Sequence, residues 1–168
     1  MILVSACLLG ETVRYDGQRL KTLPSFPEAW RSGDRMIPFC PEIAGGLSVP
    51  RLPAELTGCC GPDVILGRGE VRNTSGEDVT AAFLAGARAA VAAARHHGAV
   101  MAILKERSPS CGSRFIYDGR FTGTLRRGQG VTAALLVHHG IAVFCENRIE
   151  NACRFLDRTA GQSMGSPL

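Results

Sequence analysis

The chain has 168 residues, of which 45% are hydrophobic and 20% are charged, and its formal net charge is +4. This length favours one domain whose core needs no disulfides, and seven cysteines make an odd number that argues against a disulfide framework. No apolar run reaches the roughly 20 residues of a membrane span, and the start MILVSACLLG lacks the basic segment of a signal peptide. We therefore expect a single domain over residues 1–168, free thiols, a cytoplasmic location and no membrane contact.

Short apolar runs open the chain. Residues 2–6 (ILVSA) predict a strand, residues 26–33 (FPEAWRSG) a short helix and residues 35–39 (RMIPF) a second strand. Pro38 weakens that strand or places it where the strand ends. From Cys40 to Pro62 we expect one long loop rich in Gly and Pro, and a loop of that length tends to be functional.

Helical patterns dominate the second half of the chain. The clearest helix is predicted from Ser75 to His97, where SGED resembles a capping box and Gly98 supplies a stop. Its apolar face is formed by residues at helical spacing, namely Val79, Phe83, Ala87, Val91 and Ala94. Three further elements follow: a buried strand at 99–104, a helix at 130–140 and a strand at 141–144. Strands that alternate with helices indicate an α/β fold, in which a mostly parallel sheet lies between flanking helices in three layers.

Three cysteines share one position in this scheme. Cys7 and Cys40 follow the first two predicted strands, and Cys111 lies in the loop after the third. The carboxyl ends of parallel strands form the edge where α/β sheets bind ligands, so these thiols can converge there. Convergent thiolates suit zinc or an iron–sulfur cluster, and because a cuboidal cluster normally takes four thiolates, three would leave one iron open. The residues alone leave a second interpretation open, in which all three are buried core residues.

The remaining cysteines and the histidines carry weaker signals. Packing roles are expected for the other four cysteines, which are Cys59, Cys60, Cys145 and Cys153. The histidines stand in pairs at the predicted ends of two helices, His96 with His97 and His138 with His139. Their charge suits the helix dipole there, at the end of the units away from the cysteine edge. We therefore expect neither group to take part in the site.

Five segments in fixed order carry a family resemblance: ILVSACLLG with RYDG, FCPEIAGGLSVPRLPAE, GEDVTAAFLAGA, AILKERSPSCGSRFIYDGRFTG and GQGVTAALLVHHGIAVF. They resemble the thiouracil desulfurase family, over nearly the whole chain from Ile2 to about Asn147. The resemblance implies non-redox removal of sulfur from a thiolated pyrimidine, which gives the oxo base and hydrogen sulfide. It also implies a 4Fe–4S cluster with one open iron, held by the three cysteines that match the motifs, Cys7, Cys40 and Cys111. Relatives often carry a further cysteine before RYDG, and Val13 at that place indicates that no ligand comes from it.

Three residues near these cysteines are candidates for the chemistry. Glu42, two residues after Cys40, is predicted to be the general base that activates water, and its alternative role is a carboxylate at a helix start. Ser108 and Ser110 flank Pro109 before Cys111 and can donate hydrogen bonds to the pyrimidine or the cluster. Their alternative is ordinary turn chemistry.

Four more residues are candidates for binding the substrate. Arg14, Tyr15 and Asp16 lie in the loop after Cys7, where they can read the N–H and C=O pattern of the ring or pair with one another. Lys105 ends a predicted strand at the same edge and can stabilise negative charge. Its alternative is a solvated side chain.

Three other functions remain open from the sequence. A metal-stabilised binding protein without catalysis would use four protein ligands and leave no iron open. A metal-free enzyme would use Cys111 as a thiolate of low pKa. Desulfuration of thiolated tRNA or of a nucleoside is the third. The resemblance implies that action on tRNA needs an additional domain, and a net charge of +4 gives no clear footprint for RNA. We therefore expect a small thiolated pyrimidine as the partner, and no nucleic acid.

Overall fold

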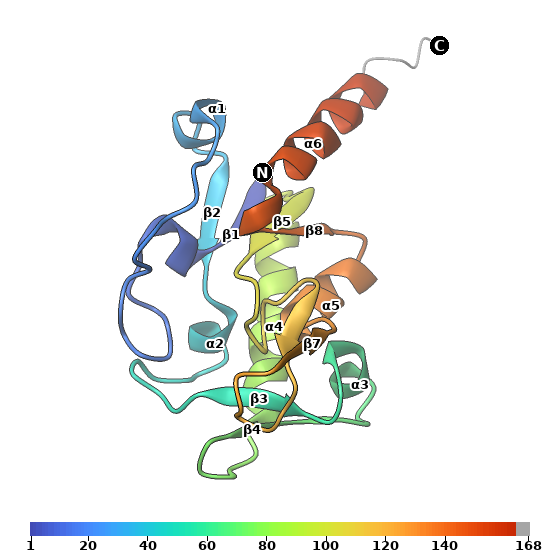
Figure 1. The fold of residues 1–168 in the computed structure, drawn as a ribbon. Helices are drawn as coiled ribbons and strands as arrows, with labels where there is room; N and C mark the ends of the chain where they lie inside the picture. Colours follow the sequence, from blue (N-terminus) through green and yellow to red (C-terminus); the bar gives the residue numbers. More distant parts are fainter. Residues whose placement is uncertain (164–168) are drawn as a thin grey trace.

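A computed structural model describes residues 1–163, so residues 164–168 of the predicted domain lie outside its described part. Its centre is a parallel sheet in the order β2-β1-β5-β8 (Figure 1). The four strands are β1 (Ile2–Ser5), β2 (Met36–Phe39), β5 (Met101–Leu104) and β8 (Ala142–Cys145). Both central strands, β1 and β5, are buried along their whole length, as their unbroken apolar runs predict for a sheet that is covered on both faces.

Helices cover both faces of this sheet. Successive side chains of a strand point to opposite faces of the sheet. On one face, Leu3, Ala102 and Leu104 pack against α4 (Thr80–His96) and α5 (Val131–His138). Their neighbours Ile2 and Val4 face the other way, into a cluster with α1 (Glu28–Arg31) and α6 (Ile149–Ser163). The predicted three-layer α/β fold with a mostly parallel sheet is confirmed.

The remaining elements are short. They are the antiparallel pair β3 (Ala54–Thr57) and β4 (Glu70–Asn73), the antiparallel pair β6 (Phe115–Tyr117) and β7 (Leu125–Arg127), the helices α2 (Pro41–Ala44) and α3 (Gly61–Ile65), and the 3-10 turns η1 (Ala6–Leu9) and η2 (Glu146–Arg148). The prediction of one loop from Cys40 to Pro62 is therefore wrong, since that segment holds α2, β3 and the start of α3. Pro41 at the first position of α2 favours a helix start there.

The predicted start of the long helix at Ser75 is also wrong. The carboxamide oxygen of Asn73 accepts the backbone N–H groups of Ser75 and Glu77, at 3.1 and 3.0 Å, which folds this segment into a turn after β4. Asp78 Oδ1 then accepts the N–H of Thr80 at 2.9 Å, and the helix begins there. The SGED pattern thus belongs to a turn that local side-chain bonds stabilise, a known competitor of helix starts.

Two glycines set how closely α2 approaches α4. A Cβ atom on Gly86 would overlap the carbonyl oxygen of Pro41, and one on Gly45 would overlap the carbonyl oxygen of Ala82. The two backbones are therefore in direct contact, which fixes the short helix that carries Glu42 directly after Cys40. None of the helices within residues 1–163 is long and apolar enough to cross a bilayer.

Gly86→Ala tests this contact. At an exposed position of a helix, a change from Gly to Ala stabilises the protein by about 1 kcal/mol. At position 86 the added methyl group would push α2 away, so we expect the free energy of unfolding to fall by about 1–3 kcal/mol. Urea denaturation measures it, with Ala85→Ser on the exposed side of α4 as the control. A more stable Gly86→Ala protein would show that α2 is not held by this contact.

Candidate functional site

The carboxyl edge of the sheet brings three thiols together. Cys7 lies in η1 directly after β1, Cys40 caps the N-terminus of α2 directly after β2, and Cys111 lies in the loop between β5 and β6. These are three adjacent strands of the sheet. Cys7 and Cys111 are buried and Cys40 is partly buried. The structure therefore places the three predicted cysteines at one edge, as the strand positions predicted.

The three thiols interact electrostatically. Burial, together with the nearby Cys40, raises the pKa of Cys7 to about 11, while Lys105 opposes the shift. Burial likewise raises the pKa of Cys111. A hydrogen bond with Ser5 acts to lower this pKa, while the charges of Glu42, Cys7 and Cys40 raise it further. The pKa of Cys40 is also raised, mainly by burial. A metal-free nucleophilic cysteine needs a lowered pKa, so this environment does not favour Cys111 as a bare thiolate.

The donor set fits a cluster better than a single ion. Within residues 1–163, no group of three or more His, Cys, Asp and Glu side chains is arranged to hold one metal ion. A zinc site requires all its sulfurs at about 2.3 Å from one point, whereas a cuboidal cluster binds each thiolate at a different iron. Three soft, mutually interacting thiols from three separate segments match the second case. Buried thiols become stable thiolates when such a group supplies positive charge.

The loop that carries Cys111 is built around Ser108. The Oγ atom of Ser108 accepts the backbone N–H groups of Ser110 and Cys111, at 3.1 and 3.0 Å. Ser110 is fully buried, and its hydroxyl pairs with the Thr132 hydroxyl of α5 at 2.8 Å. A Cβ atom on Gly130 would overlap the carbonyl oxygen of Ser110, so the loop rests directly on the start of α5. The contact predicted between Ser110 and substrate stays a prediction, because the bond observed is structural.

Glu42 lies between this loop and a partly buried arginine, Arg51. Its Oε2 atom accepts a hydrogen bond from Arg51 Nε at 2.7 Å, and its Oε1 atom accepts one from Ser108 Oγ at 3.4 Å. The Arg51 side chain is 9% exposed and also donates to the carbonyl oxygen of Val13 at 3.0 Å. That carbonyl oxygen is 3.9 Å from the thiol of Cys40. Sequence reasoning missed Arg51, since no spacing distinguishes it from the other arginines of the chain.

The residues predicted to bind substrate already have partners. Arg14 forms an ion pair with Asp16 at 3.0 Å, and its guanidinium carbon lies 6.0 Å from the centre of the Tyr15 ring. The Tyr15 side chain is exposed, and its carbonyl oxygen accepts the backbone N–H of Arg51 at 2.8 Å. The positive charge of Arg14 acts on Cys7, whose pKa it lowers slightly. These three residues therefore pair with one another beside the thiols, and their contact with substrate stays a prediction.

Lys105 is paired rather than solvated. Its ammonium group donates to Glu146 Oε1 at 2.6 Å and to the carbonyl oxygen of Glu106 at 3.2 Å. The backbone N–H of Lys105 donates to Ser5 Oγ at 3.0 Å. Glu146, which sequence reasoning missed, begins η2 after β8 and, like Lys105, acts on the pKa of Cys7. The ammonium group of Lys105 thus lies at the edge of the sheet that carries the cysteines, with the carboxylate of Glu146 beside it.

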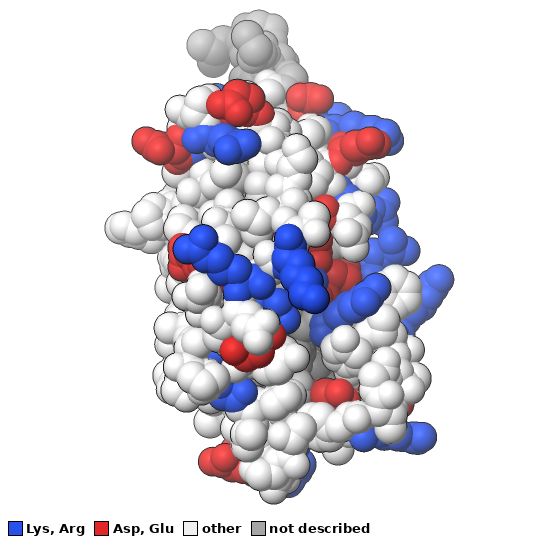
Figure 2. Space-filling model, turned by 60° about the vertical axis from the view of Figure 1, so that its left-hand side comes forward, with Lys and Arg blue, Asp and Glu red and all other residues white. Residues whose placement is uncertain are grey.

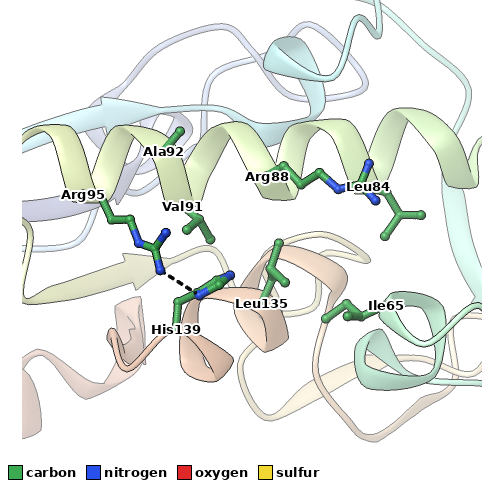
Figure 3. A pocket seen from close by; sticks show the side chains of 8 residues that line it. All are labelled: Ile65, Leu84, Arg88, Val91, Ala92, Arg95, Leu135 and His139. Carbon is green, nitrogen blue, oxygen red and sulfur yellow. Dashed lines mark hydrogen bonds between the residues drawn. The ribbon is translucent and has the colours of Figure 1, made fainter.

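Two grooves lie outside the three thiols. The first, of about 330 Å³, runs along α4 and α5 and is lined by Ile65, Leu84, Arg88, Val91, Ala92, Arg95, Leu135 and His139 (Figure 3). It contains none of the predicted site residues. The second, of about 620 Å³, lies at the carboxyl edge of the sheet and has Glu106, Cys145 and three arginines in its lining.

Figure 2 shows Lys and Arg side chains gathered across the middle of one face, around a hollow, with acidic side chains among them. Acidic side chains thus interrupt this band of basic side chains.

Comparisons with known proteins show the family of the chain and agree with its fold. The family model described as 2-thiouracil desulfurase matches residues 2–148. A protein of Bacillus subtilis (strain 168), named uncharacterized protein YbbK, is 44% identical over 156 residues, which cover 90% of this chain and 99% of that protein. A solved structure of the [4Fe-4S]-dependent thiouracil desulfidase TudS superposes with a TM-score of 0.82 at 46% identity, over 93% of this chain and 97% of that one. The chain is therefore an enzyme of the 2-thiouracil desulfurase family.

Proposed function

We propose that the protein hydrolyses the C=S bond of a small thiolated pyrimidine such as 2-thiouracil. One water is consumed, the C=S group becomes C=O, and hydrogen sulfide leaves, without transfer of electrons. The observation that carries this proposal is the convergence of two buried thiols and one partly buried thiol at one sheet edge, with Glu42 and Ser108 beside Cys111. The similarity to a [4Fe-4S]-dependent thiouracil desulfidase supports the same reaction.

Cys7, Cys40 and Cys111 would hold a 4Fe–4S cluster and leave one iron without a protein ligand. Within residues 1–163 no Cys, His or carboxylate completes them as a single-ion site, and the other four cysteines are free thiols in other elements. When bound, the cluster would supply a Lewis acid that polarises the thiocarbonyl group. The burial of Cys7 and Cys111 keeps bulk water away from the thiolates.

Glu42 would act as the general base for the attacking water. Arg51 holds one oxygen of the carboxylate at 2.7 Å and so fixes its direction. Among residues 1–163, the other oxygen has only the long 3.4 Å contact with Ser108, and it therefore has room to accept a hydrogen bond from water. Ser108 in turn accepts the backbone N–H of Cys111. The position of Glu42 is therefore coupled to that of the loop that carries Cys111. A carboxylate held in this way beside the Cys111 loop would take the proton from the attacking water, as general base catalysis requires.

The remaining candidates would hold the pyrimidine. Lys105 uses two of its three ammonium hydrogens on Glu146 and Glu106, which leaves one for an oxygen of the ring. Arg14, Tyr15 and Asp16 would contact the pyrimidine from the loop after Cys7, where Tyr15 is exposed. Ser110 would support the loop through Thr132. All seven cysteines are free, and we place the reaction in the reducing cytoplasm for that reason.

Anaerobic purification tests the proposal. We expect a brown protein with about four irons and four sulfides per chain, which converts 2-thiouracil to uracil with an equal amount of sulfide. The same protein, stripped of iron by a chelator, should be inactive and regain activity on reconstitution. A reconstituted protein that holds four irons but forms no uracil would instead favour the metal-stabilised binding protein. An active protein without iron would make Cys111 a nucleophile in its own right.

A further inference from the structure

Glu106 is a buried carboxylate to which the proposed reaction gives no role. It follows Lys105 after β5 and is 6% exposed. Its Oε1 atom accepts the backbone N–H groups of Ser113, Arg114 and Phe115, at 3.0, 3.1 and 3.0 Å. Its Oε2 atom accepts the hydroxyl of Ser113 at 2.9 Å. One side chain thus fixes the backbone of three consecutive residues.

The carboxylate is ionised in this setting. Burial acts to raise the pKa of Glu106, but hydrogen bonds from the backbone of Phe115 and Arg114, and from the side chains of Cys145 and Ser113, outweigh it and lower the pKa. Among the ion pairs of residues 1–163, none involves Glu106. A buried charge without a cation is costly unless its hydrogen bonds are all made, so this charge is stable only while residues 113–115 keep their position.

The hydrogen bonds between Glu106 and residues 113–115 close the loop that carries Cys111. Glu106 and Ser113 are seven residues apart, and Cys111 lies between them. At the other end, the backbone N–H of Glu106 donates to Glu146 Oε2 at 2.8 Å. The preceding N–H, that of Lys105, donates to Ser5 Oγ. Ser5 in turn lies two residues before Cys7 and forms a hydrogen bond with the Cys111 thiol. These bonds therefore link the chain segments that carry Cys7 and Cys111.

We propose that Glu106 is the positioning residue that preforms the Cys111 loop for the cluster. It contacts neither substrate nor the reacting atoms, and it acts through the backbone of residues 113–115. The proposal rests on the cluster ligation given above. A preformed loop lowers the cost of ordering three ligands at once, and it fixes the direction of Cys111 relative to Glu42 through Ser108.

Glu55 offers a matched control for this role. It is 8% exposed, and its Oε2 atom likewise accepts two backbone N–H groups, from Gly119 at 2.9 Å and Phe121 at 3.1 Å. Those bonds fix the turn between β6 and β7, which contains no cysteine. Removing Glu55 therefore removes a similar buried carboxylate from a different loop.

The experiment compares Glu106→Ala, Glu106→Gln and Glu55→Ala in the reconstituted protein. Three quantities are measured without oxygen: the rate of iron loss to a chelator, the electron paramagnetic resonance spectrum of the dithionite-reduced cluster, and the melting temperature of the iron-free protein. We expect Glu106→Ala to lose iron about 10- to 100-fold faster and to change the spectrum. Glu106→Gln should lie between, because its amide oxygen still accepts the three N–H groups. Glu55→Ala should lower only the melting temperature.

A wild-type rate of iron loss and spectrum in both Glu106 variants would overturn the proposal. Equal changes in the Glu55→Ala protein would also overturn it, by showing a general loss of stability. If Glu106→Ala does not fold, Glu106→Gln carries the test. A wild-type protein that binds the cluster but forms no uracil would disprove the desulfuration and leave this test intact.

Discussion

Cys111→Ala is expected to remove the cluster and abolish desulfuration. The variant loses one of three thiols that converge at the sheet edge, and it loses it at a buried position. Changes to residues that only support a ligand weaken metal binding by about 10- to 100-fold, so loss of the ligand itself should exceed that. Iron per chain and the rate of uracil formation measure the effect.

Cys60→Ala is the matched control for that variant. Cys60 caps α3, with Asp63 accepting its backbone N–H at 3.0 Å, and it comes from a segment outside the three strand ends. We expect its iron content and rate to equal those of the wild type, and its stability to fall by about 1 kcal/mol at most. Loss of iron in Cys60→Ala, or four irons in Cys111→Ala, would contradict the assignment of the ligands.

Glu42→Gln is expected to separate chemistry from cluster binding. The single glutamine oxygen can still accept from Arg51, and only the long 3.4 Å contact with Ser108 is lost, so the loops and the iron content should stay as in the wild type. The amide cannot take a proton from water, and loss of a general base costs about 10²- to 10⁴-fold in rate. The kcat for 2-thiouracil, measured beside iron content and melting temperature, tests this separation.

Glu28→Gln serves as the control for Glu42→Gln. Both glutamates lie in the first turn of a four-residue helix, where a carboxylate stabilises the helix dipole. If Glu42 were only a helix-start carboxylate, both variants would lose similar stability and keep their kcat. A fall in kcat limited to Glu42→Gln would assign it the catalytic role.

Local sequence patterns predicted the part of the site that follows from strand order. Cys7, Cys40 and Cys111 each come after an apolar run, and runs of that kind become adjacent parallel strands in an α/β fold, so their shared edge could be inferred. The start of α4 could not, because the Asn73 side chain competes for the backbone of residues 75–77. Most strands of the antiparallel pairs were missed because β3 (AELT), β4 (EVRN) and β7 (LRR) mix charged with apolar residues and so lack the unbroken apolar run of β1 and β5.

The polar contacts of the site could not be predicted, because their partners are far apart in the chain. Glu146 is 41 residues from Lys105, and Ser108 is 66 residues from Glu42. Arg51 is only nine residues from Glu42, but the turn that brings them together has no regular period. Pattern reasoning therefore identifies which residue types gather at the edge, while the pairs that fix their directions emerge only from the fold.

Isotope labelling of the product tests the central claim most directly. The anaerobically reconstituted protein is given 2-thiouracil in water enriched in oxygen-18, with no reductant, and uracil and sulfide are quantified by mass spectrometry and a colorimetric assay. We predict uracil with one oxygen-18 atom at the carbon that carried sulfur, and one sulfide per uracil. Uracil without the label, or a need for added reductant, would contradict hydrolytic, non-redox desulfuration at the three-cysteine edge.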